Sequence, residues 1–124
     1  MTVPALDALA AEVVATLRGA GARFAFVHGS VATGSQRADS DFDVAAWWPS
    51  DPPAAFEVLL PPGVDLVVLN SAPLELAGRI ALHGQLLFDD DPPSRVRWTA
   101  TTRKIYADEL PRLMRSHREF AEAV

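Results

Sequence analysis

The feature that most constrains this chain is the stretch from residue 22 to residue 48, where two apolar segments enclose a polar loop. Residues 22–28 are rich in Phe and Val and run directly into Gly29-Ser30. The loop over 29–40 is rich in Gly, Ser, Thr and Asp, and a second apolar segment follows over 42–48. This pattern predicts two strands joined by a loop of the kind that carries function. The two strands can pair antiparallel across the loop.

The rest of the chain alternates helical and extended patterns. Apolar residues with helical spacing predict a helix that begins at Pro4 and stops near Gly19, and they are Leu6, Leu9, Ala10, Val13, Val14 and Leu17. We expect a short helix over 54–60, a strand over 64–69, a helix over 73–83 and a short strand over 86–88. The remainder should be helical, with a kink or break near Pro111.

This order of elements predicts an α/β (α+β two-layer) fold with a mixed β-sheet flanked by helices. With 124 residues, the chain is long enough for one core and too short for two ordinary domains, so we expect a single domain over 1–124. It contains no cysteine, which excludes disulfides and thiolate metal sites. No run approaches the ~18 apolar residues of a membrane span either. We therefore expect a cytoplasmic protein that does not bind a membrane.

The charge is acidic overall and unevenly distributed. The net charge of −5 argues against general binding to nucleic acid, because affinity for phosphate backbones comes from Lys and Arg. Residues 1–91 carry 12 acidic and 4 basic side chains, whereas residues 92–124 carry 4 and 7. The basic side chains of this last segment can solvate a helix, or they can meet an acidic partner or a triphosphate.

Three carboxylates point to a metal site. Asp41 and Asp43 are two residues apart in an extended segment, so their side chains share one face. Asp65 comes near the start of the next apolar segment, where a charge needs water or a cation. Acids gathered on one face repel unless a divalent cation compensates them, and oxygen ligands favour Mg²⁺ or Mn²⁺. By contrast, we expect residues 89–91, three consecutive aspartates, to form a solvated turn.

The loop supplies groups suited to phosphate. Gly29 at a strand end lets the backbone approach an anion, and the Ser30 hydroxyl adds a donor. The loop is neither a P-loop nor a dinucleotide fingerprint, since it lacks the Gly-Lys-Ser/Thr and the glycine spacing of those motifs. Metal-binding acids beside a phosphate-binding loop indicate a nucleotide.

Residues 28–44, HGSVATGSQRADSDFDV, resemble the minimal nucleotidyltransferases of the DNA polymerase β superfamily. The signature of that family is Gly-Ser, ten residues and Asp-x-Asp, which this segment matches; Ser40 before the first aspartate also fits. The resemblance implies the nucleotidyltransferase fold, with Ser40 assigned to the nucleotide-binding loop. Many relatives carry Arg or Lys at one or both of the positions held here by Val31 and Thr33.

The resemblance also implies roles for the site residues. Asp41 and Asp43 would bind the metals, and Asp65 would complete one metal site and help to activate the attacking hydroxyl. Gly29 and Ser30 would hold the β- and γ-phosphates of the nucleotide. The reaction would be an in-line displacement at the α-phosphorus, with pyrophosphate as the leaving group.

Nothing in the chain suggests a second domain for an acceptor, so we expect a protein to bring it. Similar nucleotidyltransferases are commonly antitoxins of a HEPN-domain ribonuclease toxin. The resemblance thus implies transfer of AMP from ATP to a hydroxyl of that toxin, expected to be a tyrosine. One alternative is an antitoxin that masks the toxin by contact without catalysis, which Val31 and Thr33 motivate. Another is transfer to a small hydroxyl compound such as an aminoglycoside.

Overall fold

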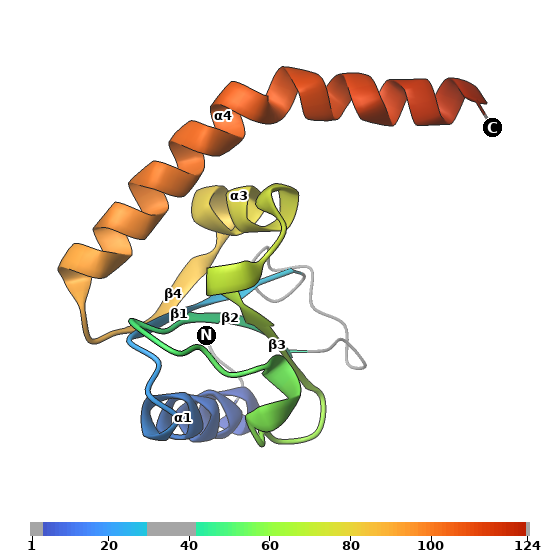
Figure 1. Cartoon of the computed structure of the whole chain (residues 1–124). Helices are drawn as coiled ribbons and strands as arrows, with labels where there is room; N and C mark the ends of the chain where they lie inside the picture. Colours follow the sequence, from blue (N-terminus) through green and yellow to red (C-terminus); the bar gives the residue numbers. More distant parts are fainter. Residues whose placement is uncertain (1–3, 30–41, 124) are drawn as a thin grey trace.

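The computed structural model describes residues 4–29 and 42–123 (Figure 1). Three α-helices, two short 3-10 helices and four strands follow one another within these residues. In chain order they are α1 (Pro4–Gly19), β1 (Phe24–His28), β2 (Phe42–Trp47), η1 (Ala55–Glu57), β3 (Val64–Val68), η2 (Leu69–Ser71), α3 (Leu74–His83), β4 (Gln85–Asp89) and α4 (Pro92–Ala123).

The four strands form one mixed sheet in the order β3-β2-β1-β4. β1 pairs antiparallel with β2, as predicted, and also with β4, whereas β2 and β3 are parallel. Strands β3 and β4 therefore form the edges. This arrangement confirms a mixed sheet flanked by helices.

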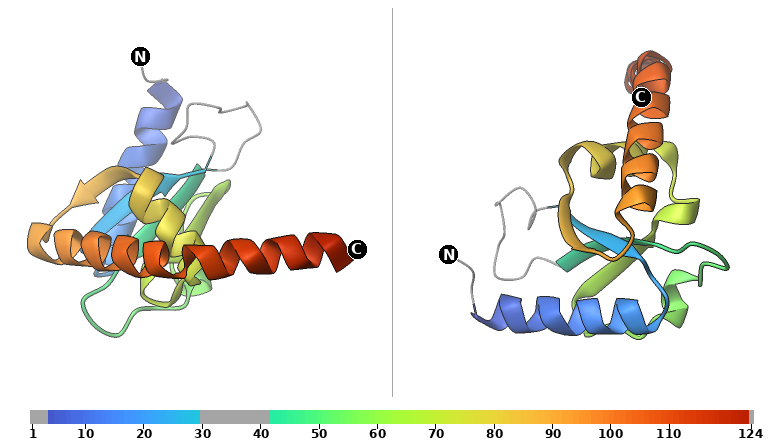
Figure 2. Two further views of the ribbon diagram at one scale, coloured as in Figure 1. Left: turned by 90° about the horizontal axis from the view of Figure 1, so that it is seen from above. Right: turned by 90° about the vertical axis from the view of Figure 1, so that its left-hand side faces the viewer.

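Helices cover both faces of the sheet (Figures 1 and 2). Val13 and Leu17 of α1 are fully buried in a core that also contains Val27 and Val44. A second core, on the other face of the sheet, centres on Phe24. It contains the alternate positions of the strands together with residues of α3 and α4. Because successive side chains of a strand point to opposite faces, the two cores together contain most residues of β1, β2 and β3.

Helix α4 packs against α3, and glycine makes the close contact possible. A Cβ at Gly78 would overlap the ring of Tyr106, so only a residue without a side chain fits there. The Arg103 guanidinium donates to the Ala81 carbonyl at 2.7 Å, which ties the two helices together. α4 continues through Pro111 and changes direction along its length (Figure 1). The helix is therefore not broken at this proline, and it bends along its length.

Several predicted elements differ in extent from the observed ones, most of them by one or two residues. The helix expected over 54–60 is reduced to the single turn η1, between Pro53 and Pro61, because a proline follows too soon for more turns. The strand expected over 64–69 ends at Val68, and the chain turns into η2. None of the helices described is long and apolar enough to cross a membrane.

Candidate active site

Three polar side chains form a row across the sheet. His28 on β1 pairs with Asp43 on β2, and Asp43 pairs with Asp65 on β3. Their strand neighbours Phe42, Val44 and Val64 belong to the core beneath α1. The row therefore lies on the opposite face, the face that α3 covers. Adjacent strands lie about 4.8 Å apart, so the two carboxylates are neighbours although 22 residues separate them in sequence.

Gly29 follows the row at the end of β1, and its backbone lies against Asp43. Its φ of 75° is in the region that favours glycine. A Cβ placed there would lie 2.5 Å from Oδ2 of Asp43, which is far too close. Glycine at this position thus serves two needs: it permits the turn and leaves room for the carboxylate.

His28 is half-buried beside Asp43. Burial lowers the pKa of His28 below its ordinary value, and this effect outweighs the nearby Asp43 carboxylate and a backbone hydrogen bond with Val44, which both act in the opposite direction. Its Nε2 atom is buried and has no hydrogen-bond partner among the described residues. Among the described residues, an imidazole with an unsatisfied nitrogen therefore lies next to Asp43.

The paired carboxylates fit a hard divalent cation. Asp43 is partly buried and Asp65 is exposed, and no ion pair to a basic side chain involves either of them within the described residues. Two neighbouring carboxylates repel, and carboxylate oxygens are the ligands that Mg²⁺ prefers. Residues 4–29 and 42–123 contain no group of three His, Asp, Glu or Cys side chains arranged around a metal ion. The third predicted ligand, Asp41, lies outside the described residues, as do Ser30 and Ser40.

A pocket of about 330 Å³ adjoins the row at the His28 end. One face of α3 forms its wall, and the residues around it are His28, Gly29, Leu76, Arg79, Ile80, His83 and Gly84. Neither Arg79 nor His83 was predicted from the sequence to belong to the site. The signal that could have found both is their spacing of four residues along the edge of the apolar stripe of α3.

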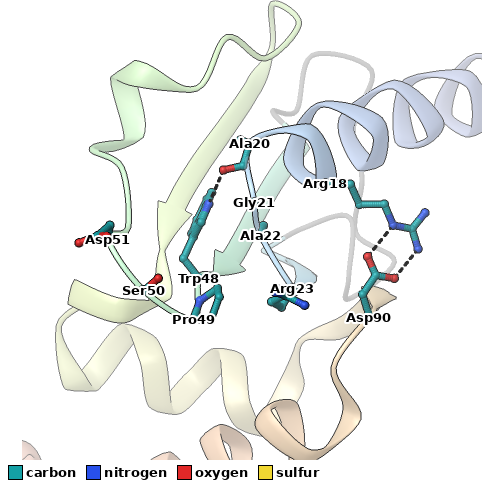
Figure 3. A pocket seen from close by; sticks show the side chains of 10 residues that line it. All are labelled: Arg18, Ala20, Gly21, Ala22, Arg23, Trp48, Pro49, Ser50, Asp51 and Asp90. Carbon is teal, nitrogen blue, oxygen red and sulfur yellow. Dashed lines mark hydrogen bonds and ion pairs between the residues drawn. The ribbon is translucent and has the colours of Figure 1, made fainter.

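A second pocket, of about 460 Å³, lies at the opposite end of the strands (Figure 3). Arg18 of α1 makes two hydrogen bonds of 2.8 Å to Asp90, which closes one side. On the other side, the indole nitrogen of Trp48 donates to the Ala20 carbonyl at 3.0 Å. These contacts join the end of α1 to the turn between β4 and α4 and to the residue that follows β2. The lining lacks the carboxylates of the row, so this pocket is separate from the candidate site.

The three consecutive aspartates of residues 89–91 and Trp47 of β2 make contacts that explain their positions. Of the three consecutive aspartates, Asp89 pairs with Arg95 at 3.0 Å, whereas Asp91 accepts from the Ser94 backbone and hydroxyl and so caps α4. The run is thus more than the solvated turn that was predicted. Trp47 stacks on Phe24 with ring centroids 5.2 Å apart, inside the core between the sheet and α4.

The mixed sheet, with neighbouring carboxylates beside a glycine turn, has the features expected of the nucleotidyltransferase class. The comparison with known families agrees. Residues 13–93 match the family described as "Polymerase beta, Nucleotidyltransferase", and this chain belongs to that family. The resemblance seen in residues 28–44 is thereby confirmed. No curated protein gave a significant match.

Solved structures of similar fold come from toxin-antitoxin complexes. A toxin-antitoxin structure with AMP-PNP matches with a TM-score of 0.66 and 22% identity, covering 87% of this chain and 98% of that chain. A chain of the MntA-HepT complex matches with a TM-score of 0.69 and 17% identity, covering 92% and 98%. The complex of tri-AMPylated Shewanella oneidensis HEPN toxin with MNT antitoxin gives 0.62 and 19%, covering 90% and 98%. These likenesses establish the fold.

Proposed function

We propose that this chain is an antitoxin that transfers AMP from ATP to a hydroxyl, expected to be a tyrosine, of a HEPN-domain toxin. The observation that carries the proposal is the register of β2 and β3, which makes Asp43 and Asp65 neighbours in a nucleotidyltransferase domain. The solved complexes add support, since one contains AMP-PNP and another a tri-AMPylated HEPN toxin with its MNT antitoxin.

Asp43 and Asp65, with Asp41, would hold Mg²⁺ or Mn²⁺. The metal would neutralise phosphate charge and lower the pKa of a bound hydroxyl. Gly29, with Ser30 and Ser40, would hold the nucleotide from the end of β1. The protein's own contribution is then to position the triphosphate and the acceptor for in-line displacement.

The open edge of the site is consistent with a protein acceptor. β3 is an edge strand and Asp65 is exposed, so a hydroxyl on a large partner can approach from that side. The face next to His28 is instead covered by α3. A partner that binds over β3 would bring its hydroxyl to the acids without entering an enclosed pocket.

The proposal is tested by intact-mass spectrometry of the protein encoded beside this chain, after incubation with the chain, ATP and Mg²⁺. We expect a gain of one or more AMP units, with loss of the toxin's ribonuclease activity. An Asp43→Asn/Asp65→Asn double variant should give neither. Asp51→Asn is the matched control, because Asp51 is an exposed aspartate beyond the far end of β2.

Other outcomes identify the alternatives. Neutralisation of the toxin by both the wild-type chain and the double variant, without a change in mass, would mean that the chain masks its partner by contact. Transfer of AMP to an aminoglycoside, with no change in the partner, would mean a small-molecule acceptor. Either result would overturn the proposed function.

A further inference from the structure

The pocket beside His28 has the chemistry of an anion site. None of its lining residues is acidic, and two of them, Arg79 and His83, carry nitrogen donors. Both side chains are exposed, and neither makes an ion pair or side-chain hydrogen bond with another residue in the described part of the chain. Within residues 4–29 and 42–123, a permanent cation and an imidazole thus stand unpaired around a pocket at the edge of an acidic site.

The position of these two residues is fixed by α3. They are four residues apart, so they lie one above the other on the helix surface. Ile80, between them in sequence, is 2% exposed and anchors the helix on the sheet. Arg79 and His83 are therefore held at the rim of the pocket by a packed element and not by a loop.

The geometry of in-line displacement determines which part of a nucleotide would lie next to Arg79 and His83. Under the proposed function, a partner hydroxyl would reach the α-phosphorus from the open side, over the edge strand β3 with its exposed Asp65. The leaving group must depart in the opposite direction. Along the row, that direction leads from Asp43 to His28, Gly29 and the pocket.

We propose that Arg79 and His83 bind the β- and γ-phosphates of the nucleoside triphosphate and receive the pyrophosphate. This inference rests on the proposed function. In the transfer step, the acceptor oxygen forms a bond to the α-phosphorus while the bond to the bridging oxygen of the β-phosphate breaks. The hydroxyl proton passes to the Asp65 carboxylate, and the electron pair leaves with the pyrophosphate. The Arg79 guanidinium, whose hydrogen-bond donors match the geometry of a phosphate, stabilises the negative charge that develops on the pyrophosphate.

The test compares two nucleotides by titration calorimetry in Mg²⁺, without any toxin. AMP-PNP has the phosphates in question and AMP lacks them. We expect Arg79→Gln to weaken the binding of AMP-PNP about tenfold or more, because a charged hydrogen bond is lost. His83→Asn should weaken it to a smaller extent. Neither variant should change the affinity for AMP. Arg115→Gln is the matched control, since Arg115 is an exposed arginine near the far end of α4.

Three results would overturn the inference. An equal loss of affinity for AMP and AMP-PNP would mean that the pocket holds the nucleoside, and an unchanged affinity for both would mean that it holds neither. A wild-type chain that binds no AMP-PNP would remove the inference and the proposed function together. If the chain binds AMP-PNP through Arg79 but leaves the toxin unmodified, the phosphate site stands and the proposed transfer of AMP to the toxin is wrong. Melting curves of the variants check that they fold.

Discussion

Asp43 of β2 lies directly beside Asp65 of β3 in the parallel ladder, so two carboxylates share one face of the sheet at neighbouring positions. Side chains opposite each other in a sheet interact, and like charges in such a pair destabilise it. The fold therefore retains a local repulsion that a bound divalent cation would relieve. This relationship links the stability of the protein to the proposed chemistry of the site.

Replacing Asp65 should change the response of the protein to metal. Without divalent ions, Asp65→Asn should raise the melting temperature slightly, because the repulsion with Asp43 disappears. Mg²⁺ should raise the melting temperature of the wild-type chain and have a much smaller effect on the variant. Differential scanning calorimetry with and without Mg²⁺ measures both effects. Asp51→Asn should behave as the wild type; the same response to Mg²⁺ in all three proteins would argue against a metal at this pair.

Gly29→Ala should destabilise the protein and displace the Asp43 carboxylate. Any side chain at this positive φ costs about 1 to 2 kcal/mol, and here a Cβ would also lie 2.5 Å from Oδ2 of Asp43. Gly63→Ala is a matched control, because Gly63 has a φ of 83° with nothing within 4 Å of the added atom. Urea unfolding should show a larger loss for Gly29→Ala than for Gly63→Ala. Equal losses would show that Asp43 moves aside without cost.

Gly78→Ala should loosen α4 from α3. Alanine normally stabilises a helix relative to glycine by about 1 kcal/mol, but a Cβ at position 78 would overlap the Tyr106 ring. We expect a net loss of about 1 to 3 kcal/mol, typical of overpacking. Gly19→Ala, at the end of α1 with nothing within 4 Å, should be neutral or stabilising. Chemical denaturation of the two variants gives the comparison, and a stabilised Gly78→Ala variant would contradict the packing described.

His28 should make the protein less stable in mild acid. Its pKa is lowered in the folded state, chiefly by burial, so the unfolded chain binds its proton first as the pH falls. The free energy of unfolding should therefore decrease as the pH drops below the ordinary histidine pKa of 6.5. Urea unfolding at several pH values should show a shallower decrease for His28→Gln than for the wild type. Identical pH dependence in both proteins would exclude a contribution from His28.

Much of the fold follows from local sequence patterns. The apolar spacing of residues 6–17 places α1, and the two apolar segments around the Gly-Ser loop place β1 and β2 as an antiparallel pair. These predictions succeed because helix and strand periodicities are local properties. The composition of residues 54–60 favours a helix, but prolines on both sides limit it to the single turn η1.

The sequence by itself determined the family, through the spacing of Gly29-Ser30 and Asp41-x-Asp43, and named Asp65 as the third acid. Only the tertiary structure decided that Asp65 lies beside Asp43, that His28 completes their row, and that Arg79 of α3 adjoins it. The reason is physical. Register between strands and the face on which a helix packs depend on burial across the whole core, and contacts between distant residues leave no local pattern.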